Sequence, residues 1–123
     1  MIQIRRGYTR IAILLFGIVI KIPNIFNERA FVYGMYANIH ESEIWNMAKE
    51  HKNSKYLAKT YFRSAFGLVL VAKRYNVLNR DLTDEEKSQI PLTAFDPKRE
   101  NYGILDNEQI VVLDYGHECW FTW

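Results

Sequence analysis

Three oxygen-bearing side chains near the C-terminal end are of types that can bind a metal ion. Asp96 and Asn101 form the pattern D-x-x-x-x-N, and the apolar run Ile110–Leu113 leads directly into Asp114. Carboxylate and amide oxygens are ligands that Mg²⁺ prefers in proteins. Phosphoryl transfer is one chemistry that needs such residues, because it depends mainly on positioning and on charge neutralisation.

Each of these residues also has an ordinary structural explanation. Asp96-Pro97 is a common way to begin a turn, and Asp114-Tyr115-Gly116 suits a turn after a buried strand. Their order along the chain, together with a lysine and a glutamate further upstream, favours a functional interpretation over a set of unrelated turns.

Length and composition indicate one modest domain. The chain has 123 residues, of which 49% are hydrophobic and 15% aromatic. Its 16 lysines and arginines nearly balance its 14 aspartates and glutamates, so charge does not favour a nucleic-acid partner. Cys119 is the single cysteine, which fits a reducing, cytoplasmic location. Cys119 and the nearby His117 could form a nucleophile or metal pair, but an unreactive thiol is the commoner case.

One apolar segment, Ile11–Ile20, raises the question of a membrane. It lies between Arg10 and Lys21 and is much shorter than the roughly 20 residues that a spanning helix needs. A signal peptide has a similar apolar core, but no small-residue cleavage site follows here. We therefore expect strands in this segment and no membrane partner. A β-rich protein associated with a membrane is the alternative.

The apolar pattern predicts an α+β protein. Residues 2–16 favour a hairpin, a third strand is expected over 18–22, and a helix over 27–51 with Asn27 as its N-cap. Gly34 could divide this helix into two pieces. The other expected elements are strands over 55–62 and 66–72, a short helix within 80–87 capped at Thr83 or Asp84, a hairpin turning at 106–107, and a strand over 110–113.

These elements and motifs together resemble the protein-kinase-like fold. Asp96 and Asn101 match the family's H-R-D-x-x-x-x-N loop, and Asp114-Tyr115-Gly116 matches its D-F-G turn. Val19-Ile20-Lys21-Ile22 resembles the family's V-A-I-K strand. Three strands, a helix and two strands follow the order of the family's amino-terminal lobe. The compact chain, with frequent Asn, Lys, Ile and Tyr, suggests a bacterial or bacteriophage source.

The resemblance implies a single minimal domain over residues 1–123. Residues 1–74 would form an amino-terminal lobe, with an antiparallel sheet of about five strands and one main helix. Residues 75–123 would form a much reduced second lobe that carries the catalytic loop. Because the sequence given ends at Trp123, we expect no activation segment and no peptide-docking helices.

The resemblance also implies catalytic roles. In the family, the lysine of the third strand contacts the α- and β-phosphates of ATP, and a helix glutamate holds that lysine. These roles fall to Lys21 and Glu41, with Glu43 as a second candidate for the glutamate. Asp96 would be the base that accepts the proton of the attacking hydroxyl group.

ATP and Mg²⁺ are the cofactors that the resemblance implies. Asn101 and Asp114 would hold the metal. The adenine would contact main-chain groups around Val71 and Lys73, and the phosphates would lie near the turn at Gly7. That turn departs from the family, because it lacks the other glycines of G-x-G-x-x-G.

Two functions stay open at this point. The chain could be an ATP-binding phosphotransferase with an unknown acceptor. It could instead be a weakly active or inactive pseudokinase-like module that binds a protein partner, such as a host protein. Ala94-Phe95 stands where the family has His-Arg, so we expect control by activation-loop phosphorylation to be missing and Asp96 to be less firmly held. The aromatic C-terminal end, with Trp120, Phe121 and Trp123, is the expected surface for a partner or a homodimer.

Overall fold

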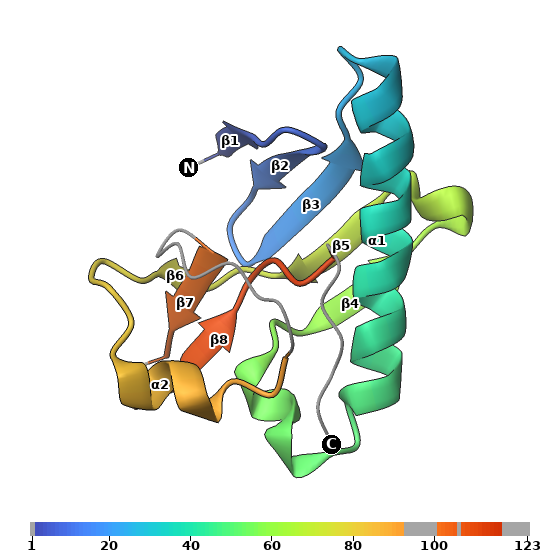
Figure 1. Ribbon diagram of the computed structural model, residues 1–123. Coiled ribbons are helices and arrows are strands. Elements are labelled where there is room, and N and C mark those ends of the chain that lie inside the picture. The colour runs from blue at the N-terminus through green and yellow to red at the C-terminus, as the bar shows by residue number, and fades with distance from the viewer. Residues whose placement is uncertain (1, 93–100, 106, 117–123) are drawn as a thin grey trace.

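The computed structural model describes residues 2–92, 101–105 and 107–116 and has an α+β fold (Figure 1). An antiparallel sheet of five strands has the order β1-β2-β3-β5-β4, and one long helix, α1, packs against it. The predicted five-stranded antiparallel sheet and single main helix are therefore confirmed. The elements of this part are β1 (Gln3–Arg6), β2 (Arg10–Leu14), β3 (Ile18–Pro23), α1 (Glu28–Ala48), β4 (Thr60–Arg63) and β5 (Leu70–Lys73).

A second, smaller sheet follows in the chain. Its three antiparallel strands have the order β6-β7-β8, and a short helix, α2, precedes β7. Tyr102 of this sheet and Tyr115 after it are fully buried in a cluster that also holds Ile44 of α1, so the second sheet and α1 share one core. The remaining elements are the 3₁₀ helices η1 (Lys52–Tyr56) and η2 (Ala65–Gly67), then β6 (Asn76–Val77), α2 (Asp84–Gln89), β7 (Tyr102–Ile104) and β8 (Ile110–Val112).

The register of the five-stranded sheet sorts its side chains onto two faces. Arg5 pairs with Ala12, and Ala12 pairs with Lys21, so these three side chains share the face that α1 covers. Residues directly opposite one another in antiparallel strands point to the same side. Arg10 and Lys21 lie on this inner face and are both buried. Two cations therefore enter the interior from two neighbouring strands.

The outer face of the same sheet is apolar. One cross-strand row runs through all five strands, because neighbouring members are register partners. Ile4 and Phe62 at its ends are exposed, and the side chains between them are partly buried. The row consists of Ile4, Ile13, Ile20, Val71 and Phe62.

Helix α1 begins where its sequence predicts. The side chain of Asn27 accepts a hydrogen bond from the backbone N–H of Ala30, which is the predicted N-cap. The helix runs without interruption through Gly34. A Cβ at Gly34 would lie 2.2 Å from the carbonyl oxygen of Thr9 and 2.8 Å from the Cα of Pro23. Glycine at this position thus allows α1 to approach the backbone of the sheet.

The prediction of strands over 55–62 and 66–72 was wrong in its boundaries. Residues 52–56 form η1, in which the His51 side chain caps the backbone N–H of Asn53, and β4 begins only at Thr60. Phe66 and Gly67 both have positive φ, which turns the chain between β4 and β5. Local caps and turns here override the strand preference of the apolar residues.

The apolar segment 11–20 forms most of β2 and the first half of β3, as expected from its length. No helix among the described residues is long and apolar enough to span a bilayer. The division of the chain at residue 74 stays a prediction, although the five-stranded sheet ends at Lys73 and the second sheet begins at Asn76.

Gly34→Ala is expected to destabilise the protein. Helix propensity favours alanine by about 1 kcal/mol, but the contact with the Thr9 carbonyl forces a backbone shift. We expect a net loss of about 1–3 kcal/mol in the free energy of unfolding, measured by urea denaturation. Gly17→Ala is the control, because a Cβ there meets nothing within 4 Å. Equal stability of the two variants would contradict the close approach of α1.

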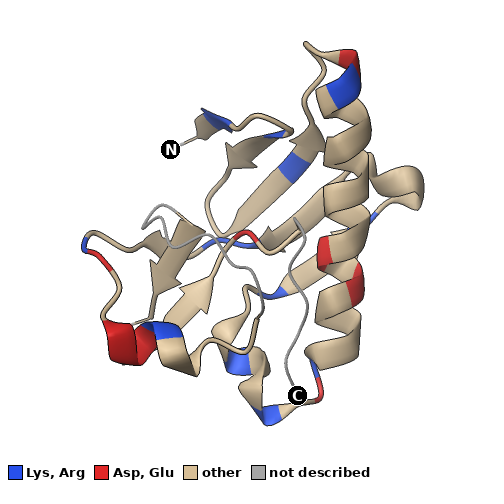
Figure 2. Cartoon of the chain, in the orientation of Figure 1, with Lys and Arg blue, Asp and Glu red and all other residues tan. Residues whose placement is uncertain are grey.

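The first turn of α2 predicts a small dependence of stability on pH. Hydrogen bonds from Arg80, and then from the backbone N–H of Thr83, lower the pKa of Glu86 to about 2. A carboxylate with a lowered pKa stabilises the folded state above its unfolded pKa, and this stabilisation is lost as the pH falls towards 2. Figure 2 shows the acidic residues that gather on α2.

Glu86→Gln should lower the free energy of unfolding by less than about 1 kcal/mol at pH 7, because the pair lies near the surface. The difference from the unaltered protein should shrink between about pH 4.5 and pH 2. Glu85→Gln, which removes an exposed carboxylate from the same helix, serves as the control. A difference that grows on acidification would exclude this ion pair as its cause.

Candidate functional site

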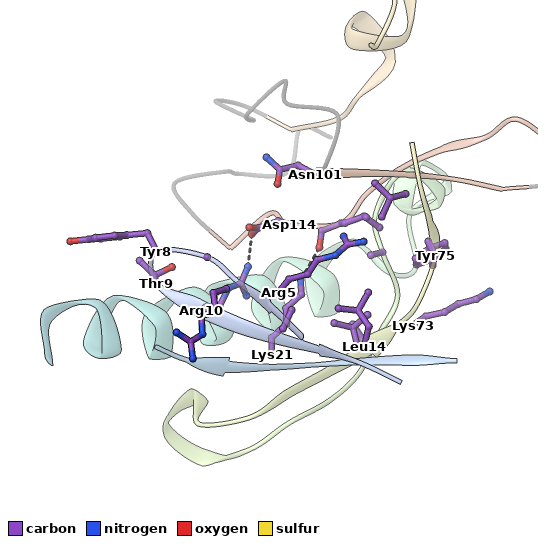
Figure 3. Close-up of a pocket in the computed structure, with 18 residues that line it drawn as sticks. Arg5, Tyr8, Thr9, Arg10, Leu14, Lys21, Lys73, Tyr75, Asn101 and Asp114 are labelled. Carbon is purple, nitrogen blue, oxygen red and sulfur yellow. Dashed lines mark hydrogen bonds and ion pairs between the residues drawn. The ribbon is translucent and has the colours of Figure 1, made fainter. Parts of the chain in front are cut away.

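A cleft of about 750 Å³ opens between the inner face of the five-stranded sheet and the second sheet (Figure 3). Its walls combine small or apolar side chains with basic ones. Arg5, Lys21 and Lys73 are among its basic residues, and Asp114 is the one carboxylate that lines it among the described residues. The apolar wall includes Ala12, Leu14, Val19, Ala58, Ala72, Tyr75, Val77 and Leu113.

The carboxylate of Glu41 is 1% exposed and lies behind two residues that line this cleft, Arg10 and Lys21. Its Oε2 accepts a hydrogen bond from Lys21 Nζ at 2.7 Å. Its Oε1 accepts from Arg10 Nη2 at 3.2 Å and from the backbone N–H of Tyr115 at 3.1 Å. The structure thus brings Lys21 and Glu41 together, whereas Glu43 is exposed elsewhere on the same helix.

Arg10 links the buried glutamate to Asp114. Its Nη2 also contacts Asp114 Oδ1, and its Nη1 donates to Asn38 Oδ1 at 3.0 Å. Burial alone lowers the pKa of Arg10, but the carboxylates of Asp114 and Glu41 outweigh this effect and raise the pKa above its usual value. The guanidinium group is therefore a permanent cation at the floor of the cleft.

Two further buried groups hold this arrangement in place. Asn38, on α1, donates to the carbonyl oxygens of Lys21 at 3.1 Å and Gly67 at 2.9 Å while it accepts from Arg10. Tyr115 donates its hydroxyl hydrogen to the carbonyl oxygen of Ala58 at 2.7 Å. Burial, followed by the nearby Glu41 carboxylate, raises the pKa of Tyr115 well above its usual value. The tyrosine stays neutral and fixes the segment after β8.

Asn101 and Asp114 reach the cleft through the β7–β8 hairpin. The backbone N–H of Leu113 donates to the carbonyl oxygen of Asn101 at 2.8 Å, so the residue before β7 lies beside the end of β8. Leu113 in turn offers its carbonyl oxygen to Lys21 Nζ at 2.7 Å. Figure 3 shows Asn101 and Asp114 on the side of the cleft opposite Lys21 and Leu14.

The described residues do not make a complete magnesium site. Asp114 is one carboxylate ligand and already pairs with Arg10, while Asn101 adds an amide. In the described ranges, no group of three or more His, Cys, Asp or Glu side chains could hold a metal ion. Asp96, the predicted base, lies outside the described residues, as do His117, Cys119 and the aromatic C-terminal end. No reaction step in this cleft is therefore assigned to a metal ion.

The turn between β1 and β2 is closed by its own hydrogen bonds. The N–H of Gly7 donates to the carbonyl oxygen of Arg10 at 2.8 Å, and Asn24 donates to the carbonyl oxygens of Tyr8 and Thr9, both at 2.8 Å. Gly7 lines the cleft, but its N–H is used within the turn. Basic side chains, more than backbone N–H groups, are thus available to an anion here.

The predicted adenine-binding residues of β5 differ in their placement. The Val71 side chain belongs to the outer apolar row, whereas Ala72 and Lys73 line the cleft. The N–H of Lys73 donates to the carbonyl oxygen of Lys59 at 2.8 Å, so this main-chain group is used within the fold. A planar ligand would meet mainly the side chains of Ala72 and Tyr75 at this end.

Sequence reasoning missed Arg10 and Asn38. The sequence indicates Arg10 as a charge that flanks an apolar segment and as one of the arginines near the Gly7 turn that could donate to phosphate, but not as a buried ion-pair residue. A better indication was its position: Arg10, Ala12 and Leu14 alternate along β2, so the arginine faces inward if the other two do. Asn38 lies within the predicted helix, and no motif distinguishes it from a surface residue.

Glu41→Gln should lower the free energy of unfolding by about 3–5 kcal/mol, because it leaves two buried cations without their shared carboxylate. Urea denaturation followed by circular dichroism measures the effect. Glu43→Gln, at an exposed position of α1, should change stability by less than about 0.5 kcal/mol. Similar losses in both variants would show that Glu41 is not the central ion-pair residue.

Comparisons of the chain with protein-family models, with curated proteins and with solved structures give no match. Sequence relatives therefore assign no role to the cleft, and its function has to be argued from the residues that line it.

Proposed function

We propose that the chain is a minimal kinase-like protein whose cleft binds ATP or a closely related nucleotide. The observation that carries this proposal is the buried pair of Lys21 and Glu41, 2.7 Å apart, at the base of a basic cleft. In the family that the sequence resembles, this pair holds the lysine amine where the phosphate charge lies. Lys21 would contact the phosphates, and Glu41 would position it.

The order of the elements supports the same proposal. Three strands, helix α1 and two strands follow one another as in a kinase amino-terminal lobe, and the β7–β8 hairpin ends at Asp114-Tyr115-Gly116. Lys21 on β3 donates a hydrogen bond to Glu41 on α1, which are the strand and the helix that carry this pair in the family. These contacts join residues that are distant in sequence, which unrelated turns and surface charges would not do.

The shape and chemistry of the cleft suit a nucleotide. Ala72, Val77 and Tyr75 offer apolar and aromatic surface to a base, and ligand sites commonly combine such walls with a few charged groups. Arg5 lies one strand away from Ala12 and two from Lys21 in the same cross-strand row, so it can share the phosphates with the lysine.

A weakly active or inactive module is the second candidate, and the pairing of Asp114 with Arg10 favours it. Phosphotransfer in the family depends on that aspartate to hold metal. Transfer of the γ-phosphate to an acceptor would use Asp96 as the base. In this second case the nucleotide would stabilise a surface that binds a protein partner or a second copy.

Lys21→Met should weaken the binding of a fluorescent ATP analogue at least about tenfold, because a charged hydrogen bond to phosphate contributes about 1.5–3 kcal/mol. Lys52→Met removes an exposed lysine from η1 and should leave the affinity unchanged. Circular dichroism confirms that both variants are folded. If Lys21→Met binds as tightly as the unaltered chain, the cleft is not the nucleotide site.

Radiolabelled ATP separates the two candidates. If the chain transfers the γ-phosphate to itself or to an added protein, Asp114→Ala should abolish the transfer, because this aspartate faces the cleft. Glu108→Ala is the control, since it removes an exposed carboxylate from the β7–β8 connection. Transfer that persists in Asp114→Ala would contradict the catalytic assignment. Nucleotide binding without any transfer would favour the non-catalytic module.

A further inference from the structure

Arg10 contacts the carboxylate of Asp114, which is the group that a divalent cation in this cleft would have to bind. The guanidinium group is 7% exposed and contacts three acceptors: Glu41, Asp114 and Asn38. Two of these acceptors belong to α1 and one to the segment after β8. Because a planar guanidinium group offers several donors in fixed directions, it can bridge two carboxylates at once.

The charges at the base of the cleft are balanced without a metal ion. Arg10 and Lys21 carry two positive charges, and Glu41 and Asp114 carry two negative charges. The rim of the cleft adds Arg5, Arg6 and Lys73 and, within the described ranges, no further carboxylate. A nucleotide without metal would therefore enter a cleft whose rim is positive and whose base is already neutral.

A divalent cation at Asp114 would face an electrostatic cost. It would have to displace the buried guanidinium group of Arg10 from this carboxylate, or share the carboxylate, whose side chain is 38% exposed, with it. A buried cation that loses its partner is costly, and like charges disfavour each other's binding. The basic rim would raise this cost for the free ion, because it repels cations and attracts polyanions.

We propose that the cleft takes its nucleotide as a metal-free polyanion, with Arg10 as a fixed internal cation in place of Mg²⁺. This inference rests on the proposed nucleotide-binding function and narrows its ligand. Lys21 and Arg5 would contact the phosphates directly. Arg10 would act as a positioning residue, because it keeps Asp114 from repelling the phosphates and holds it against α1.

Calorimetric titration with ATP tests this inference on the unaltered chain. One titration contains EDTA, and the other contains excess Mg²⁺ at the same ionic strength. We expect binding in EDTA that is at least as tight as in Mg²⁺. Binding that occurs only with Mg²⁺ would overturn this inference and leave the proposed nucleotide function standing. Absence of binding in both titrations would overturn the proposed function and, with it, the metal-free ligand.

Mn²⁺ alone provides a second readout that does not depend on a nucleotide. Electron paramagnetic resonance measures the free Mn²⁺ in a titration with the protein. We expect no saturable binding to the unaltered chain below the millimolar range. Arg10→Gln should create a Mn²⁺ site, because Asp114 loses its cationic partner while Glu41 keeps Lys21.

Two controls make the Mn²⁺ experiment specific. The double variant with Arg10→Gln and Asp114→Asn should lose the new Mn²⁺ site. Arg29→Gln removes an exposed arginine from α1 and should create no site. Equal Mn²⁺ affinity of the unaltered chain and of Arg10→Gln would overturn the proposal. If Arg10→Gln does not fold, the titrations of the unaltered chain with ATP in EDTA and in Mg²⁺ still test the proposal of a metal-free nucleotide.

Discussion

The carboxylate of Glu41 is the group on which the rest of the structure depends. It is almost completely buried, and three donors from three different parts of the chain converge on it: Lys21, Arg10 and the backbone N–H of Tyr115. A lone buried carboxylate would be strongly destabilising, but these donors replace the water that it loses. Strands β2 and β3, helix α1 and the end of the β7–β8 hairpin are consequently tied to a single point.

The same convergence gives the cleft its chemical character. Asp114, which lines the cleft, and Glu41, which lies behind it, are both paired with cations, and the basic side chains of Arg5, Arg6 and Lys73 stay at the rim. An anionic ligand is therefore the natural occupant on electrostatic grounds. The apolar wall of the cleft and the resemblance of the sequence motifs are the two further arguments that this anion is a nucleotide. Neither argument depends on a metal ion.

Much of the five-stranded sheet and of α1 could be predicted from the sequence, because their determinants are local. Asn27 caps the helix, and the β-branched runs of β2 and β3 form strands close to their expected ends, whereas β4 and β5 begin four to five residues later than expected. The Lys21–Glu41 pair could be predicted only through a family resemblance, since nothing local links a strand lysine to a helix glutamate. The alternation along β2 indicates that Arg10 faces inward, but its partners, and the whole role of Asn38, follow from packing between distant segments, which appears only in three dimensions.

The apolar outer row of the sheet gives the buried charges one more consequence. In most antiparallel sheets, a polar outer face and an apolar inner face report whether two strands are paired correctly, since a shift by one residue exchanges the faces. Here Ile13 and Ile20 on the outer face are as apolar as Leu14 and Val19 on the inner face, so that distinction is weak between β2 and β3. A shift by one residue would, however, turn Arg10 or Lys21 away from Glu41. The contacts of Arg10 and Lys21 with Glu41 thus favour the correct register of these strands. A sheet in the wrong register would bury the Glu41 carboxylate without these partners and would be less stable.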